Sequence, residues 1–168
     1  MDARRESEHA PLKNNTTAER KSEREFVVTR TVNGPARLVY EAWTRPDLFK
    51  RWWAPKSFGL TILSCEMDVR VGGGYRLLFA AEPEPMAFFG KYLEVKPHSR
   101  LSWSNDESPD GAVTTVTFEE KDGKTLIVLQ DLFPSKEALE AAAGSHDGMQ
   151  ETFDQLDEFL ASAAPHEG

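Results

Sequence analysis

The feature that most constrains the fold is a series of six apolar segments between Leu60 and Phe133, separated only by short turn sequences. The segments read LTILSCEMDV, YRLLFAA, MAFFGKYLEV, RLSWSN, AVTTVTFEE and TLIVLQDLF, and the breaks between them contain Gly, Pro or Asp. Segments of this length that are rich in β-branched and aromatic residues are typical of strands. Because no connection is long enough to hold a helix, the pattern predicts an antiparallel meander.

The residues before the meander predict one more strand and two short helices. EFVVTRTV at 25–32 alternates apolar and polar side chains, which indicates a seventh strand. Pro35 suits the first turn of a helix over 36–43, and Thr44 can cap a second helix that has Pro46 in its first turn.

The residues after the meander return to helix. Ser135 can cap a short helix, and from Asp147 an apolar residue recurs at i, i+4, i+7 and i+11, as Met149, Phe153, Leu156 and Leu160. An amphipathic helix must cover apolar surface, and only one face of the sheet is large enough. The sequence therefore predicts an α+β fold in which a curved antiparallel sheet of about seven strands wraps around a long C-terminal helix.

The composition indicates one domain with two tails. The chain has 168 residues, of which 39% are hydrophobic, enough for one substantial core. Residues 1–24 have almost nothing to bury and are predicted to form a flexible tail, residues 25–163 the domain, and residues 164–168 a short second tail. The N-terminus has no apolar signal segment and no stretch reaches the roughly 20 apolar residues of a membrane helix, so a cytoplasmic location is expected.

Three of the four tryptophans lie in the segment WTRPDLFKRWWAPKSFG, at 43–59, beside Lys50 and Arg51. Such a segment could contact nucleic acid, sit at a membrane interface, line a pocket or anchor a core. The net charge of −8 opposes binding to a phosphate backbone, so no nucleic-acid partner is expected. Adjacent tryptophans with basic neighbours leave the membrane as a minor alternative.

Helical spacing places the aromatic residues of this segment on one face and the basic pair on the other. Trp43 and Trp52 are therefore interpreted as anchors of two helices that close one end of the sheet. Trp53 and Phe58, in and near the following loop, are the candidates to reach the rim of a cavity.

Signals for catalysis or metal binding are weak. The four histidines lack the spacing of zinc ligands, and Cys65, the single cysteine, excludes an internal disulfide and is read as a core residue, so neither a metal nor a cofactor is predicted. The best acid–base pair is His146 with Asp147, although Asp147 is explained more simply as a helix cap. VGGGYR at 71–76 opens a strand, which favours a tight turn over a phosphate loop.

Several phrases of the sequence resemble one known family. AWTRPDLFKRWWAP, CEMDVRVGGGYR, GKYLEVKPHSRLSWSN and TLIVLQ, in this order of predicted elements, resemble the bacterial homologues of the activator of the heat-shock-protein-ninety ATPase, in the START-like SRPBCC superfamily. The resemblance covers about Phe26 to Ser162. Two positions depart from the family pattern: Met149 follows Gly148 where a tryptophan is usual, and Gln130 stands where many relatives have histidine.

The resemblance implies the helix-grip fold, with a deep cavity between sheet and C-terminal helix that takes a small hydrophobic or aromatic ligand, similar to a lipid or polyketide. Counting alternate strand residues toward the helix, and adding helix and loop residues, gives as candidate ligand-binding residues Trp53, Phe58, Met67, Tyr75, Leu77, Phe79, Phe89, Lys91, Trp103, Val128, Gln130, Met149 and Phe153. Lys91 or Gln130 would orient a polar group of the ligand.

Two other functions stay open at this point. An enzyme of the polyketide-cyclase or hydratase kind, found elsewhere in the superfamily, would need a buried acid–base pair. A chaperone-interaction module, as in the eukaryotic relative, would need a counterpart of that protein's separate N-terminal domain, which residues 1–24 are too few to supply.

Overall fold

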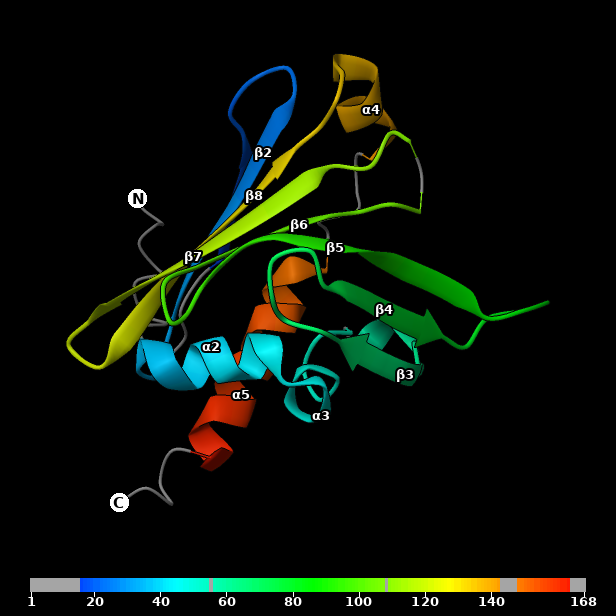
Figure 1. Cartoon of the computed structure of the whole chain (residues 1–168). Coiled ribbons are helices and arrows are strands. Elements are labelled where there is room, and N and C mark those ends of the chain that lie inside the picture. The colour runs from blue at the N-terminus through cyan, green and yellow to red at the C-terminus, as the bar shows by residue number, and fades with distance from the viewer. Residues whose placement is uncertain (1–15, 55, 108, 143–147, 164–168) are drawn as a thin grey trace, which may run out of the picture.

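The computed structural model of this chain describes residues 16–54, 56–107, 109–142 and 148–163. Eight antiparallel strands form one sheet in the order β1-β2-β8-β7-β6-β5-β4-β3 (Figure 1). The strands are β1 (Thr16–Arg20), β2 (Glu25–Val32), β3 (Ile62–Met67), β4 (Gly74–Phe79), β5 (Met86–Lys96), β6 (Arg100–Ser104), β7 (Val113–Lys121) and β8 (Lys124–Leu132). The helices are α2 (Ala36–Thr44), α3 (Pro46–Phe49), the 3-10 turn η1 (Lys56–Phe58), α4 (Lys136–Ala141) and α5 (Met149–Ala163).

The six predicted strands of the meander are confirmed as β3 to β8, each paired with the next along the chain. The predicted N-terminal strand is β2, which pairs with β8 over its whole length, from Glu25 with Leu132 to Val32 with Thr125. The prediction of an α+β, helix-grip fold is therefore confirmed. None of the described helices is long and apolar enough to cross a membrane.

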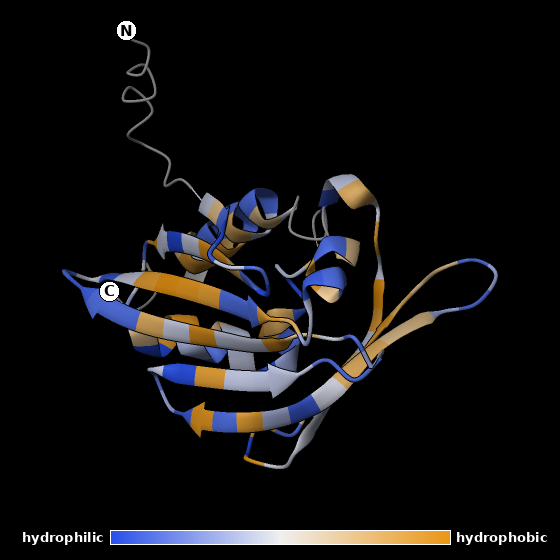
Figure 2. Cartoon of the chain, turned by 90° about the horizontal axis from the view of Figure 1, so that it is seen from above, coloured by the Kyte–Doolittle hydropathy of each residue, from blue (hydrophilic) through white to orange (hydrophobic). Residues whose placement is uncertain are grey.

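The core lies between the sheet and the helices α2, α3 and α5, which gather on one side of the strands in Figure 1. Helix α5 contributes Phe153, Leu156 and Leu160, all fully or almost fully buried, at the spacing that the sequence predicted. Figure 2 shows apolar and polar residues mixed along each strand, as expected for a sheet with one buried face.

Of the two predicted helix caps, the one at Ser135 is confirmed and the one at Thr44 is wrong. Ser135 caps α4 as expected, because its hydroxyl oxygen accepts a hydrogen bond from the Ala138 N–H at 3.0 Å. Thr44, however, does not cap α3. It ends α2 and its hydroxyl donates to the Tyr40 carbonyl at 2.9 Å, while Arg45 occupies the cap position of α3.

The N-terminal boundary of the domain lies earlier than residue 25. Thr16–Arg20, predicted to belong to the flexible tail, form β1 and pair with β2 from Thr16 with Arg30 to Arg20 with Phe26. The segment buries little apolar surface, which is why its composition resembles a tail. Backbone pairing and the hydrogen bond from the Arg30 guanidinium to the Thr16 hydroxyl at 3.0 Å hold it instead. Residues 1–15 and 164–168 lie outside the described residues.

Removing residues 1–20 should therefore lower the melting temperature by about 4–8 °C, equivalent to about 2 kcal/mol for a domain of this size. The loss comes from the β1–β2 ladder and the Thr16 contact to Arg30. Circular dichroism melting would measure it. Removing residues 1–15 alone is the control and should shift the melting temperature by no more than about two degrees; equal shifts for both deletions would contradict a stabilising β1.

Two strands face the opposite way from the prediction. In β8 Ile127 and Leu129 are buried toward the helices, so Val128 and Gln130 lie on the other face. In β5 Tyr92 is buried and Phe88 borders a cavity, so Phe89 and Lys91 are exposed on the outside. Both strands have adjacent apolar residues, and a shift of one residue exchanges the faces of a strand.

Candidate functional site

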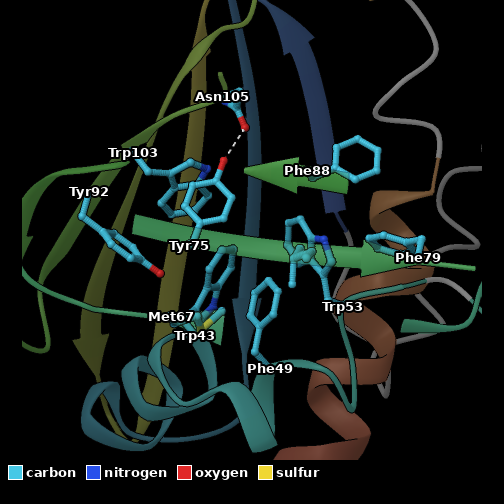
Figure 3. Close-up of a pocket in the computed structure, with 11 residues that line it drawn as sticks. Trp43, Phe49, Trp53, Met67, Tyr75, Phe79, Phe88, Tyr92, Trp103 and Asn105 are labelled. Carbon is cyan, nitrogen blue, oxygen red and sulfur yellow. Dashed lines mark hydrogen bonds between the residues drawn. The ribbon is translucent and has the colours of Figure 1, made fainter. Parts of the chain in front are cut away.

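A cavity of about 210 Å³ lies between the helical segment 43–53 and the strands β3 to β6 (Figure 3). Its walls are almost entirely aromatic or aliphatic. The lining residues are Trp43, Phe49, Trp53, Met67, Tyr75, Leu77, Phe79, Phe88, Tyr92, Trp103 and Asn105. Cavities of this lining are typical of sites for small apolar ligands.

Strand alternation supplies one wall. Tyr75, Leu77 and Phe79 follow one another on the inner face of β4, and β5 places Phe88 and Tyr92 beside them. The Phe79 and Phe88 rings meet edge to face, with centroids 5.4 Å apart. This wall is therefore built by the period of two that governs all strands.

Gly90 provides space behind the Tyr75 ring. A Cβ atom at Gly90 would lie 1.9 Å from the Ser104 carbonyl oxygen and 3.0 Å from the Tyr75 ring. Only glycine allows β5 and β6 to approach so closely at this point. Because Tyr75 pairs directly with Gly90, the residue also fixes how deep the Tyr75 ring sits.

The helical segment supplies the opposite wall through packed aromatic rings. Phe49 and Trp53 stack with centroids 4.8 Å apart, and the Trp43 ring meets that of Trp53 edge to face at 5.7 Å. Trp43 and Trp52 are buried, as predicted for anchors, and the Trp52 indole N–H donates to the Ala42 carbonyl at 3.1 Å. Such ring pairs add stability beyond the area that they bury.

Polar residues of α5 hold the loop that carries Trp53. The buried Gln155 amide donates to the carbonyls of Trp52 and Ala54, both at 2.9 Å, and its oxygen accepts from the Lys56 N–H. The Thr152 hydroxyl donates to the Trp53 carbonyl at 3.2 Å. Three backbone carbonyls in succession are thereby fixed to one helix, which positions Trp53 against the cavity.

One end of the cavity is polar. The Tyr75 hydroxyl lies 2.8 Å from the Ser104 carbonyl and 3.1 Å from the Asn105 side-chain oxygen, the contact dashed in Figure 3. The Asn105 amide donates to the Ala112 carbonyl and to the Thr114 hydroxyl. Burial, followed by the nearby Glu107 carboxylate, raises the pKa of Tyr75, so this hydroxyl keeps its proton.

A second, wider cavity of about 450 Å³ adjoins the first. The two share Trp53, Phe88, Trp103 and Asn105, and the second continues past Leu129 toward α4 and Met149. Its lining includes acidic side chains, among them Glu107 and Asp110, and it is more open to solvent. The wider cavity therefore offers a route from the surface to the aromatic one.

The structure brings some of the predicted site residues together and separates others. Trp53, Met67, Tyr75, Leu77, Phe79 and Trp103 line the aromatic cavity, and Met149 lines the wider one. Phe153 is fully buried in the core against Trp43 and Trp52. Five residues lie elsewhere: Phe58 is 56% exposed in η1, and Phe89, Lys91, Val128 and Gln130 belong to outward faces of β5 and β8.

Five lining residues were not among the predicted ones. Phe88 and Tyr92 were missed because β5 turns the face opposite to the predicted one toward the helices. The direct pairing of Tyr75 with Gly90 fixes which face that is. Trp43 was expected as an anchor of the helices and Phe49 only on their apolar face, and both belong to the core as well as to the cavity wall. Asn105 was read as the end of a strand. Nothing in its neighbourhood in the sequence distinguishes it from an ordinary turn residue.

The described lining residues offer an apolar surface with a few hydrogen-bonding groups. Cys65 is near these residues in β3, but burial raises its pKa to about 11, so the thiol is protonated and weakly nucleophilic at neutral pH. The described residues contain no group of three His, Cys, Asp or Glu side chains placed to hold a metal ion. His146 and Asp147, the predicted acid–base pair, lie outside the described residues.

Fold and cavity together define a helix-grip protein with an aromatic-lined interior. The family of proteins described as "Activator of Hsp90 ATPase homolog 1-like protein" matches residues 33–161, and the chain belongs to that family. This agrees with the resemblance found in its sequence phrases. No curated protein matches the chain.

Solved structures of bacterial proteins share the fold. A Rhodobacter sphaeroides protein superposes with a TM-score of 0.80 at 21% identity, over 88% of this chain and 99% of that one. A Nitrosomonas europaea protein gives 0.76 at 23% identity, over 86% and 99%. A Staphylococcus epidermidis protein gives 0.73 at 26% identity, over 87% and 94%.

Proposed function

We propose that the protein binds a small hydrophobic or aromatic molecule in the cavity between the helical segment 43–53 and strands β3 to β6. The observation that carries the proposal is the cavity itself, about 210 Å³ in volume and lined by eleven residues of which only Asn105 is neither aromatic nor aliphatic in character. Space of this size among large side chains is uncommon in a packed core. Burying an apolar ligand there would remove its surface from water.

A probe experiment tests the proposal. The neutral two-ring fluorophore prodan should bind the native protein at neutral pH with one-to-one stoichiometry. Leu77→Trp, on the inner face of β4, should abolish this binding because the larger side chain occupies the cavity. Leu78→Trp is the matched control, since the neighbouring residue points to the other face and should leave binding unchanged.

The stability of Leu77→Trp is the second measurement. Because the larger side chain enters an open cavity, the variant should unfold at nearly the same denaturant concentration as the native protein. In a solid core the same change would cost roughly 1–3 kcal/mol or more through overpacking. Absence of prodan binding to the native protein, together with strong destabilisation by Leu77→Trp, would refute the proposal. Independently of this test, native mass spectrometry of the purified protein would identify any ligand retained from the cell.

A further inference from the structure

The two ends of the aromatic cavity differ in how their polar groups are satisfied. At the Asn105 end the donors of two side chains are used within the protein: the Tyr75 hydroxyl donates to an oxygen of Ser104 or Asn105, and the Asn105 amide donates to Ala112 and Thr114. Neither of these two side chains has a donor left for a ligand.

At the Met67 end the Tyr92 hydroxyl has no hydrogen-bond partner among the described residues. Tyr92 is 4% exposed and lines the cavity, and its oxygen points inward, toward Met67, in Figure 3. The Trp43 indole nitrogen also lacks a partner, but the surrounding side chains bury it completely, so it is closed to a ligand. Tyr92 is therefore the donor that this end of the cavity offers.

An unpaired hydroxyl on the wall of an apolar cavity favours a ligand that carries an acceptor. Polar groups away from bulk solvent are nearly always hydrogen-bonded, because leaving one unpaired is costly. Burial raises the pKa of Tyr92, so its hydroxyl keeps the proton that it can donate. An acceptor atom on a ligand would satisfy this donor.

The cavity also limits the size and charge of that ligand. An apolar cavity of about 150 Å³ holds one benzene ring, and this one measures about 210 Å³. The described lining residues include no Lys, Arg, His, Asp or Glu, so a charged group would be buried without a counter-ion. A neutral molecule of one or two rings fits both limits.

We infer that the ligand is a neutral aromatic molecule of one or two rings, whose carbonyl or hydroxyl oxygen accepts a hydrogen bond from the Tyr92 hydroxyl. This inference rests on the proposed function and adds the chemical class of the ligand and its orientation.

The test compares two probes of nearly equal shape, 1-indanone and indane, which differ by one carbonyl oxygen. Isothermal titration calorimetry should show that the native protein binds 1-indanone more tightly. Tyr92→Phe removes only the hydroxyl and should weaken 1-indanone binding about 3- to 10-fold, the effect of one neutral hydrogen bond, while indane binding is unchanged. Tyr40→Phe removes a hydroxyl from a tyrosine outside the cavity lining and should leave both affinities unchanged.

The outcomes separate the two proposals. If both probes bind but Tyr92→Phe weakens them equally or not at all, the inferred orientation is wrong and the proposed function stands. If neither indane, 1-indanone nor prodan binds the native protein, the proposed function fails and the inference with it. The empty Tyr92→Phe protein should melt no lower than the native one, because the lost hydroxyl has no partner there.

Discussion

Gly90→Ala should lower the free energy of unfolding by about 3–5 kcal/mol, the range reached only when a substitution forces a steric or packing fault into the core. The added Cβ would lie 1.9 Å from the Ser104 carbonyl oxygen and 2.7 Å from its carbon, both backbone atoms of the neighbouring chain segment. A flexible side chain could turn aside, but here the two strands must separate. Urea unfolding followed by circular dichroism would measure the change.

The same variant should disturb the cavity, because the new Cβ also lies 3.0 Å from the Tyr75 ring. Gly34→Ala is the matched control: its Cβ would meet only the Leu160 side chain, at 3.5 Å or more, and should change stability by less than about 0.5 kcal/mol. Equal losses of stability for the two substitutions would contradict a steric requirement for glycine at position 90.

Arg30→Met should lower the free energy of unfolding by about 3 kcal/mol, the loss expected when one member of a buried ion-pair cluster is removed. Arg30 is 2% exposed on β2, and its guanidinium contacts Asp154 at 3.0 Å and Asp157 at 2.6 Å, both on α5. It also donates to Thr16 of β1. The substitution would leave two carboxylates close together with their main cation gone, and would loosen both β1 and α5 from the sheet.

Arg100→Met is the control for this variant. Its partner Glu94 lies at a similar distance, 2.7 Å, but the two side chains are 42% and 38% exposed. Exposed pairs contribute little, so the loss should be below about 1 kcal/mol in the same urea experiment. A comparable loss for both arginines would indicate that burial of Arg30 adds nothing to its contribution.

The order of elements could be derived from the sequence alone. The meander follows from apolar segments joined by turns too short for helices, and α5 follows from apolar residues at helical spacing, because each signal is local along the chain. The same is true of the Ser135 cap and of the aromatic cluster at 43–53, in which Trp43 and Trp52 were expected to be buried. Local patterns also correctly predicted six of the eleven residues that line the aromatic cavity.

Tertiary structure alone decided which face of β5 and β8 is buried, and whether residues 16–20 join the sheet. In both strands adjacent apolar residues make the two faces nearly equal in hydrophobicity, so only pairing with the neighbouring strands selects one; Val28 opposite Leu129 is such a pair. Strand β1 has little apolar surface, and its place depends on backbone hydrogen bonds to β2. The lack of a hydrogen-bond partner for the Tyr92 hydroxyl likewise cannot be predicted from the sequence, since hydrogen bonding of this group depends on residues distant along the chain.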